Sequence, residues 1–170
     1  QGYAILALDS PGTGEATSVA NVDGDQDDVV DGVFELFRNE AMLDLDRVVV
    51  LGASLGGHQA VRIAAHNRQV MAAIAITPPY DPERWIRRAS PLLLKEMGLV
   101  RDGEMVPELW EKVDRFSLVE VAGELRQPLL VFGAARDVLV PPTEAQQLAS
   151  RVGERATLVW YPRGGHCIYE

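Results

Sequence analysis

The sequence lacks several features that mark whole classes of protein. Its 170 residues include one cysteine, Cys167, so no disulfide can form within the chain, and a reducing, cytoplasmic location is expected. No stretch of about 18 apolar residues occurs, which argues against a membrane-spanning helix. The three histidines are not at metal-ligand spacing and the cysteine stands alone, so no metal site is predicted.

Positive charge is also scarce, with 16 Lys and Arg against 25 Asp and Glu and a net charge of −9. This charge repels phosphate backbones and anionic lipids, so neither nucleic acid nor a membrane surface is an expected partner. The stretch "DSPGTGE" (9–15) lacks the Lys-Ser/Thr ending of a phosphate-binding loop, and no cofactor is expected. Association of identical subunits stays open.

Apolar runs that alternate with helical patterns indicate the fold. The runs occupy residues 3–9, 47–52, 70–77, 128–133 and 156–162, and the helical patterns occupy residues 25–39, 55–67 and 141–153. Strands that are apolar throughout and alternate with helices are typical of a parallel sheet covered on both faces. The sequence therefore predicts an α/β fold with a mostly parallel sheet in a single domain of residues 1–170.

Residues 80 to 124 interrupt this alternation. They carry two tryptophans, several short helical patterns and no clear strand, and the stretch is too long for an ordinary connection. We expect a small helical insertion that either covers a site or packs on the sheet without a lid role. Its large apolar residues would line an apolar pocket or belong to the core; they are Trp85, Trp110, Leu92 to Leu94 and Met97.

A serine stands between small residues where the run at 47–52 must turn into a helix. Gly52, Ser54 and Gly56 form a Gly-x-Ser-x-Gly pattern with an apolar strand before it and a helix after it. The two glycines would allow a tight turn that keeps the Ser54 side chain exposed, and the N–H of Leu55 would point at a developing oxyanion. The context favours a nucleophilic serine over a glycine-rich turn with an idle serine.

A nucleophilic serine needs a base, and the chain has three histidines. His58 lies on the same predicted helix as Ser54, and His66 lies at the polar end of that helix. His166 stands in a Gly-Gly loop after the last strand, at the carboxyl edge of the sheet, where α/β folds place their sites. His166 is therefore the predicted base.

The histidine in turn needs an orienting carboxylate. Asp137 lies on the loop that leaves the run at 128–133, at the same edge of the sheet, and its alternative role is in a turn or a helix cap. Asp81, just after the run at 70–77, is the alternative acid. Asp9 suits the shaping of a Pro-Gly loop better than catalysis.

These motifs together resemble the α/β-hydrolase superfamily over nearly the whole chain, in the order Ser, Asp, His that this superfamily shows. The stretches "LDSPGTGEA", "GASLGGHQA", "LLVFGAARDVLVPP" and "GGHC" are most similar to one group of it. That group contains 2,6-dihydroxypseudooxynicotine hydrolase, the fungal pigment-pathway acyl hydrolases of the yellowish-green type and the fermentation-respiration switch proteins. The resemblance implies that Ser54 is the nucleophile, Asp137 the triad acid, His166 the triad base and Leu55 an oxyanion donor.

The resemblance also implies parts that the 170 residues do not supply. A strand would lie between those at 3–9 and 47–51, a loop would carry a second oxyanion donor, and a helix would follow His166. Without that strand, backbone groups inside the sheet would stay unpaired. We therefore expect the chain to be a C-terminal portion of a longer protein whose N-terminal strands complete the sheet and the oxyanion hole. If the chain is instead a complete protein, its strand pairing must be rearranged or supplied by another chain.

The predicted activity is that of an esterase-like serine hydrolase, which cleaves an ester, thioester or related acyl bond through a Ser-His-Asp triad. The expected partner is therefore a small-molecule acyl substrate. The group that the chain resembles also hydrolyses carbon–carbon bonds, so a carbon–carbon bond hydrolase is one alternative. A non-catalytic binding or regulatory protein on the same scaffold is the other.

Overall fold

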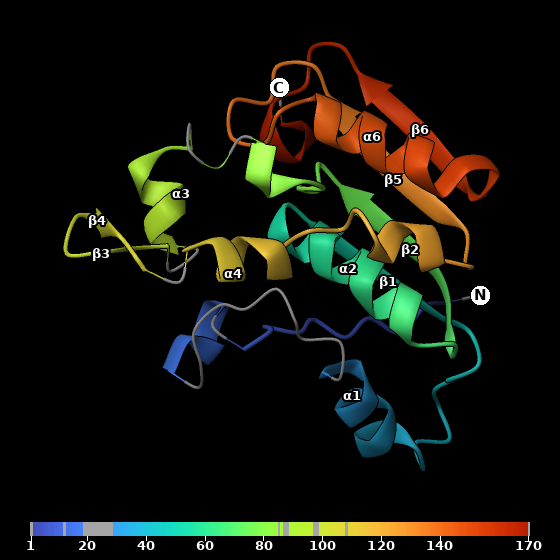
Figure 1. The fold of residues 1–170 in the computed structure, drawn as a ribbon. Helices are drawn as coiled ribbons and strands as arrows, with labels where there is room; N and C mark the ends of the chain where they lie inside the picture. Colours follow the sequence, from blue (N-terminus) through green and yellow to red (C-terminus); the bar gives the residue numbers. More distant parts are fainter. Residues whose placement is uncertain are drawn as a thin grey trace.

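The computed structural model describes residues 2–11, 13–18, 29–84, 86, 89–96, 99–107 and 109–169. Its centre is a four-stranded parallel sheet in the order β1-β2-β5-β6 (Figure 1). The strands are β1 (Val48–Ala53), β2 (Val70–Ile76), β5 (Leu129–Ala134) and β6 (Ala156–Tyr161). The predicted α/β fold with a mostly parallel sheet is confirmed.

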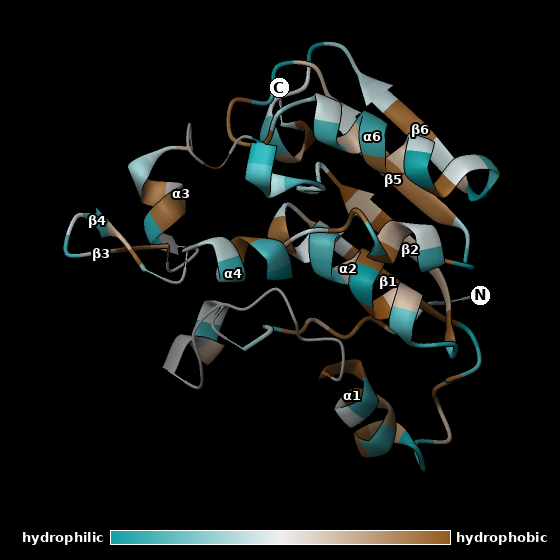
Figure 2. Cartoon of the chain, in the orientation of Figure 1, coloured by the Kyte–Doolittle hydropathy of each residue, from teal (hydrophilic) through white to brown (hydrophobic). Residues whose placement is uncertain are grey.

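One face of this sheet is covered by helices. They are α1 (Val29–Phe37), α2 (Leu55–His66), α5 (Val121–Glu124) and α6 (Thr143–Val152), with the short turn η4 (Gly153–Arg155) after α6. Their apolar side chains form one buried core with alternate strand residues, among them Val30, Val61, Ala64, Ala122, Leu148, Ala73, Ala75, Leu129 and Val131. The strands are largely hydrophobic in colour and the helices mixed (Figure 2), and the mixed colouring of the helices fits elements with one face on the sheet and the other in solvent. The residues 25–28 of the predicted first helix lie outside the described residues.

The opposite face of the sheet is partly open. Val49 and Leu51 of β1 are 45% and 64% exposed, although both are apolar. β1 is also an edge strand, because no described strand pairs with its outer side. The sequence expectation of a sheet covered on both faces therefore holds for one face of the described structure.

The predicted buried strand at residues 3–9 is wrong. The segment runs without ladder pairing, and Tyr3 and Ile5 are almost fully exposed. An apolar run makes a strand only where a neighbouring strand pairs with its N–H and C=O groups, and no described strand does so here. The segment leads into a turn, η1 (Gly14–Ser18), where the Asp9 carboxylate accepts the N–H of Glu15 at 2.9 Å.

The segment between β2 and β5 begins with the turn η2 (Pro82–Arg84) and holds α3 (Pro91–Glu96) and α4 (Leu109–Arg115) before α5. It also contains an unexpected antiparallel hairpin of β3 (Val100–Arg101) and β4 (Glu104–Met105). Asp102 and Gly103 make its turn with φ of 53° and 84°, as a tight Asp-Gly hairpin requires. The strands are too short to show an alternating pattern in the sequence. Within the described ranges, no helix is long and apolar enough to cross a membrane.

Candidate active site

Ser54 joins β1 to α2 in a backbone conformation that residues with side chains rarely adopt, with φ 53° and ψ −121°. Its N–H donates to the carbonyl of Ile76 at 2.8 Å, and its own carbonyl accepts the N–H of His58 at 3.1 Å. Although Ser54 occupies the N-cap position of α2, its hydroxyl does not cap the helix. A strained serine whose hydroxyl is not used by the helix fits a nucleophile on a strand-to-helix turn.

The glycines around Ser54 differ in why they are needed. A Cβ on Gly52 would lie 2.0 Å from the carbonyl oxygen of Gly56, and one on Gly57 would lie 3.1 Å from that of Gly52. A Cβ on Gly56 would meet nothing within 4 Å. The sequence interpretation is therefore right for Gly52, but Gly57 and not Gly56 is the second glycine that close packing requires.

Leu55 is the first residue of α2. The first N–H groups of a helix have no carbonyl partner within it, and the helix dipole favours negative charge at this end. The N–H of Leu55 therefore suits an oxyanion that forms beside Ser54.

His166 and Asp137 lie in direct contact. Nδ1 of His166 is 2.8 Å from Oδ2 of Asp137, and their side chains are 19% and 1% exposed. The other carboxylate oxygen, Oδ1, accepts the N–H groups of Leu139 and Val140, both at 2.9 Å. The carboxylate is thus held from both sides, which favours an Nδ1–H tautomer and leaves Nε2 of His166 to exchange protons.

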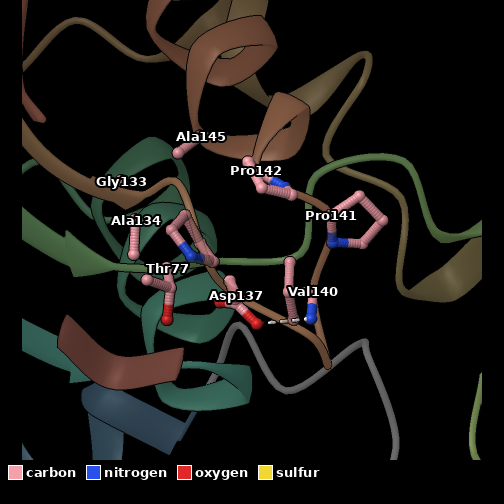
Figure 3. Close-up of a pocket in the computed structure, with 9 residues that line it drawn as sticks. Thr77, Gly133, Ala134, Asp137, Val140, Pro141, Pro142 and Ala145 are labelled. Atoms are coloured by element: carbon pink, nitrogen blue, oxygen red, sulfur yellow. Dashed lines mark hydrogen bonds between the residues drawn. The ribbon is translucent and has the colours of Figure 1, made fainter. Parts of the chain in front are cut away.

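A narrow, largely apolar pocket lies beside this carboxylate (Figure 3). It is lined by Thr77, Pro78, Gly133, Ala134, Asp137, Val140, Pro141, Pro142 and Ala145. Figure 3 shows the hydrogen bond from the N–H of Val140 to the Asp137 carboxylate at its lower wall. Apolar walls lower the local dielectric constant, and hydrogen bonds to a carboxylate are stronger in such surroundings.

Ser54 and His166 follow strands at opposite edges of the sheet, yet both are tied to the end of β2. The N–H of Ser54 donates to the carbonyl of Ile76. The N–H of Cys167, the residue after His166, donates to the hydroxyl of Thr77 at 3.1 Å. Because Ile76 and Thr77 are consecutive, the serine and the histidine segments are both held by the same end of β2, at the carboxyl edge of the sheet.

The other sequence candidates make different contacts. His58 is fully buried, with its ring centroid 5.8 Å from that of Phe116. Nδ1 of His66 lies 3.0 Å from the carbonyl oxygen of Arg62 in the helix. Asp81, the alternative acid, is paired with Arg84 at 2.5 Å.

The segment at residues 80 to 124 forms a second core next to these residues. Its buried members include Leu94, Leu99, Val113 and Phe116, together with Val140 of the Asp137 loop, and Leu55 packs against it. The segment therefore contacts both the loop that carries Asp137 and the residue after Ser54.

The residues of that segment that the sequence suggests for an apolar pocket differ in their burial. Leu94 belongs to its core, whereas Leu92 and Trp110 are exposed. Trp85 and Met97 lie outside the described residues. The side chain of Leu93 also lies outside the described residues, so Leu94 is the one proposed pocket residue whose described side chain packs in this core.

Cys167 is partly buried, and this burial raises the pKa of its thiol, while a hydrogen bond with Thr77 opposes the rise. A thiol of raised pKa is a weaker nucleophile at neutral pH. Within the part of the chain that the structure describes, no three His, Cys, Asp or Glu side chains gather as metal ligands would.

The model of the prolyl oligopeptidase family, Peptidase_S9, matches residues 1–170. The chain belongs to the prolyl oligopeptidase family. Among curated relatives, the α/β-hydrolase gkaG of Penicillium citrinum is 33% identical over 118 residues, which are 65% of this chain and 25% of that protein. The α/β-hydrolase ucsC of Acremonium sp. is 38% identical over 88 residues, 47% of this chain and 18% of that protein.

Solved structures share the fold of this chain. That of 2,6-dihydroxy-pseudo-oxynicotine hydrolase superposes with a TM-score of 0.81 at 25% identity, over 94% of this chain and 46% of that one. The structure of AbyA5 superposes with a TM-score of 0.74, covering 92% of this chain and 44% of that one. The predicted resemblance to α/β-hydrolases, and to the 2,6-dihydroxypseudooxynicotine hydrolase group, is confirmed. The chain spans less than half the length of these proteins.

Proposed function

We propose that this member of the prolyl oligopeptidase family is a serine hydrolase that cleaves an ester, thioester or related acyl bond. The observation that carries the proposal is the 2.8 Å contact between Nδ1 of His166 and Oδ2 of Asp137. It is the contact that a serine hydrolase uses to fix the tautomer of its base. The strained turn at Ser54 supports the role of the serine as the nucleophile.

In this mechanism Nε2 of His166 takes the hydroxyl proton of Ser54 as the serine oxygen attacks the substrate carbonyl. The N–H of Leu55 donates to the resulting oxyanion, and one such donor contributes roughly 3–4 kcal/mol to transition-state stability. The imidazolium then protonates the leaving group, and an acyl-enzyme forms. Water, deprotonated by the same imidazole, attacks the acyl carbonyl. The bond to the Ser54 oxygen then breaks, the imidazolium returns the proton to that oxygen, and the acid is released.

Carbon–carbon bond hydrolysis is a second candidate. A 2-hydroxy-6-oxononadienedioate/2-hydroxy-6-oxononatrienedioate hydrolase of Cupriavidus pinatubonensis is 36% identical over 75 residues, 44% of this chain and 25% of that protein. Product analysis separates the two reactions: incubation with a β-diketone and with an aryl ester shows which bond the protein breaks. Cleavage of the diketone alone would favour the carbon–carbon reaction.

The first experiment treats the protein with a fluorophosphonate probe and locates the label by peptide mass spectrometry. Ser54→Ala is the test variant, and Ser150→Ala, an exposed position on α6, is the matched control. We expect a label on Ser54 in the wild type and in Ser150→Ala, and none in Ser54→Ala. A wild type that is folded by circular dichroism yet takes no label would favour a non-catalytic scaffold.

A further inference from the structure

Thr77 occupies a position that its own residue type disfavours. It follows β2, is 3% exposed and has φ 43°, in the left-handed region where a β-branched residue is rare. Its N–H donates to the carbonyl of Phe132 at 2.8 Å, which ties its main chain to β5. Strain of this kind persists where the surrounding structure imposes it, and strained residues of this kind cluster at functional sites.

The segment that carries His166 is strained as well. Cys167 and Ile168 have φ of 57° and 61° in the short turn η5 (His166–Ile168). The N–H of Cys167 donates to the buried hydroxyl of Thr77 at 3.1 Å. A side chain from the end of β2 therefore binds the main chain next to His166.

We propose that Thr77 is a positioning residue for His166, an inference that rests on the proposed serine hydrolase function. Asp137 holds the imidazole at Nδ1, and Thr77 holds the main chain one residue beyond the same histidine. A ring that is held only at Nδ1 can still pivot about that contact. The second contact fixes the main chain that carries the ring, and this limits how far the ring can move. The N–H of Ser54 is bonded to Ile76, the residue before Thr77, so Thr77 lies next to both segments in the chain of contacts.

The expected size of the effect follows from the geometry of proton transfer. A displacement of about 1 Å at reacting groups costs on the order of 100-fold in rate. Loss of the Thr77 hydroxyl loosens the histidine without removing it. We therefore expect Ser54 to react about 10- to 100-fold more slowly, with Asp137 and His166 both still present.

The test compares Thr77→Val, which keeps the shape but removes the hydroxyl, with Thr77→Ser, which keeps the hydroxyl. Thr157→Val, at an exposed position of β6, is the matched control. One measurement is the rate at which the fluorophosphonate labels Ser54 between pH 5 and pH 9. The other is the far-downfield proton NMR signal of Nδ1–H in His166, which needs no activity. Thermal unfolding is recorded for every variant.

We expect Thr77→Val to label slowly across the pH range and to lose or broaden the Nδ1–H signal, whereas Thr77→Ser and Thr157→Val behave like the wild type. Equal labelling of Thr77→Val and wild type would overturn the proposal. If Thr77→Val does not fold, Thr77→Gly replaces it, because glycine adopts positive φ without strain and also lacks the hydroxyl.

The two proposals can fail separately. If the wild type takes no label, the serine hydrolase proposal fails, and the NMR signal alone then tests whether Thr77 positions His166. A signal that persists unchanged in Thr77→Val then overturns the positioning role, and its loss supports it.

Discussion

The loops after β2 and β5 both support the His166 segment, but they do so at different atoms. The loop after β5 brings the Asp137 carboxylate to the imidazole, whereas the loop after β2 brings the Thr77 hydroxyl to the neighbouring main chain. Each loop also carries a buried aspartate, yet Asp81 pairs with Arg84 and Asp137 contacts the histidine. A position at the carboxyl edge of the sheet therefore does not by itself give a carboxylate a role in the reaction.

The largest effect is expected from Asp137→Asn. This variant removes the charge beside Nδ1 and permits the wrong tautomer of His166, and the same change in a comparable triad lowers the rate about ten-thousand-fold. The measurement is the labelling rate of Ser54, or hydrolysis of an aryl ester once one is found. A labelling rate within tenfold of the wild-type rate would mean that the Asp137 carboxylate is not the acid of a triad, and the loop after β5 would then have no special role at the imidazole.

A moderate effect on stability is expected from Glu144→Gln. The buried Glu144 carboxylate on α6 accepts the N–H groups of Tyr80 and Asp81 at 2.8 and 2.7 Å, so it anchors the loop after β2. Hydrogen bonds to a charged group contribute more than neutral ones, and the loss should be about 1–2 kcal/mol in the free energy of unfolding.

Urea unfolding measures this loss, with the exposed Glu154→Gln as the control. We expect Glu144→Gln to lower the labelling rate of Ser54 far less than Asp137→Asn does. If Glu144→Gln lowers the labelling rate more than Asp137→Asn does, the loop after β2 matters more for the reaction than the carboxylate that contacts the imidazole.

A small effect is expected from Asp81→Asn. Its partner Arg84 is largely exposed, and such pairs contribute about 0–1 kcal/mol. The labelling rate should stay within about threefold of wild type, because this carboxylate does not contact the imidazole in the structure. A loss of labelling rate close to that of Asp137→Asn would indicate that Asp81, and not Asp137, is the triad acid.

The smallest effect concerns the Cys167 thiol, which the loop after β2 contacts through Thr77. Burial raises the thiol pKa in the folded protein, so at a pH just above the ordinary thiol pKa the unfolded chain holds fewer protons than the folded one. Stability from this group is therefore present at lower pH and decreases as pH rises through that range.

Iodoacetamide provides the check on Cys167. We expect the thiol to react more slowly in the folded protein than in urea at the same pH between 8 and 9. Equal rates in the two states would show that burial does not perturb the thiol.

Local sequence patterns predict the four strands from residue 47 onward, the helix after Ser54 and the three candidate residues. These predictions rest on apolar runs, helical spacing and the glycines beside Ser54. Each of these patterns can be recognised in the sequence without knowing which residues are its neighbours in space. The same local patterns misled at residues 3–9, because an apolar run does not show whether a neighbouring strand is there to pair with it.

Three features depend on tertiary contacts that local patterns do not show: the carboxylate that contacts His166, the need for a small residue at Gly57 and not at Gly56, and the hydrogen bond from Thr77 to the segment beside the histidine. Each of these depends on groups far apart in the chain that meet within hydrogen-bonding or van der Waals distance. Asp81 and Asp137 follow similar strands at the same edge, so their sequence contexts are alike. What separates them is the arginine beside one carboxylate and the imidazole beside the other.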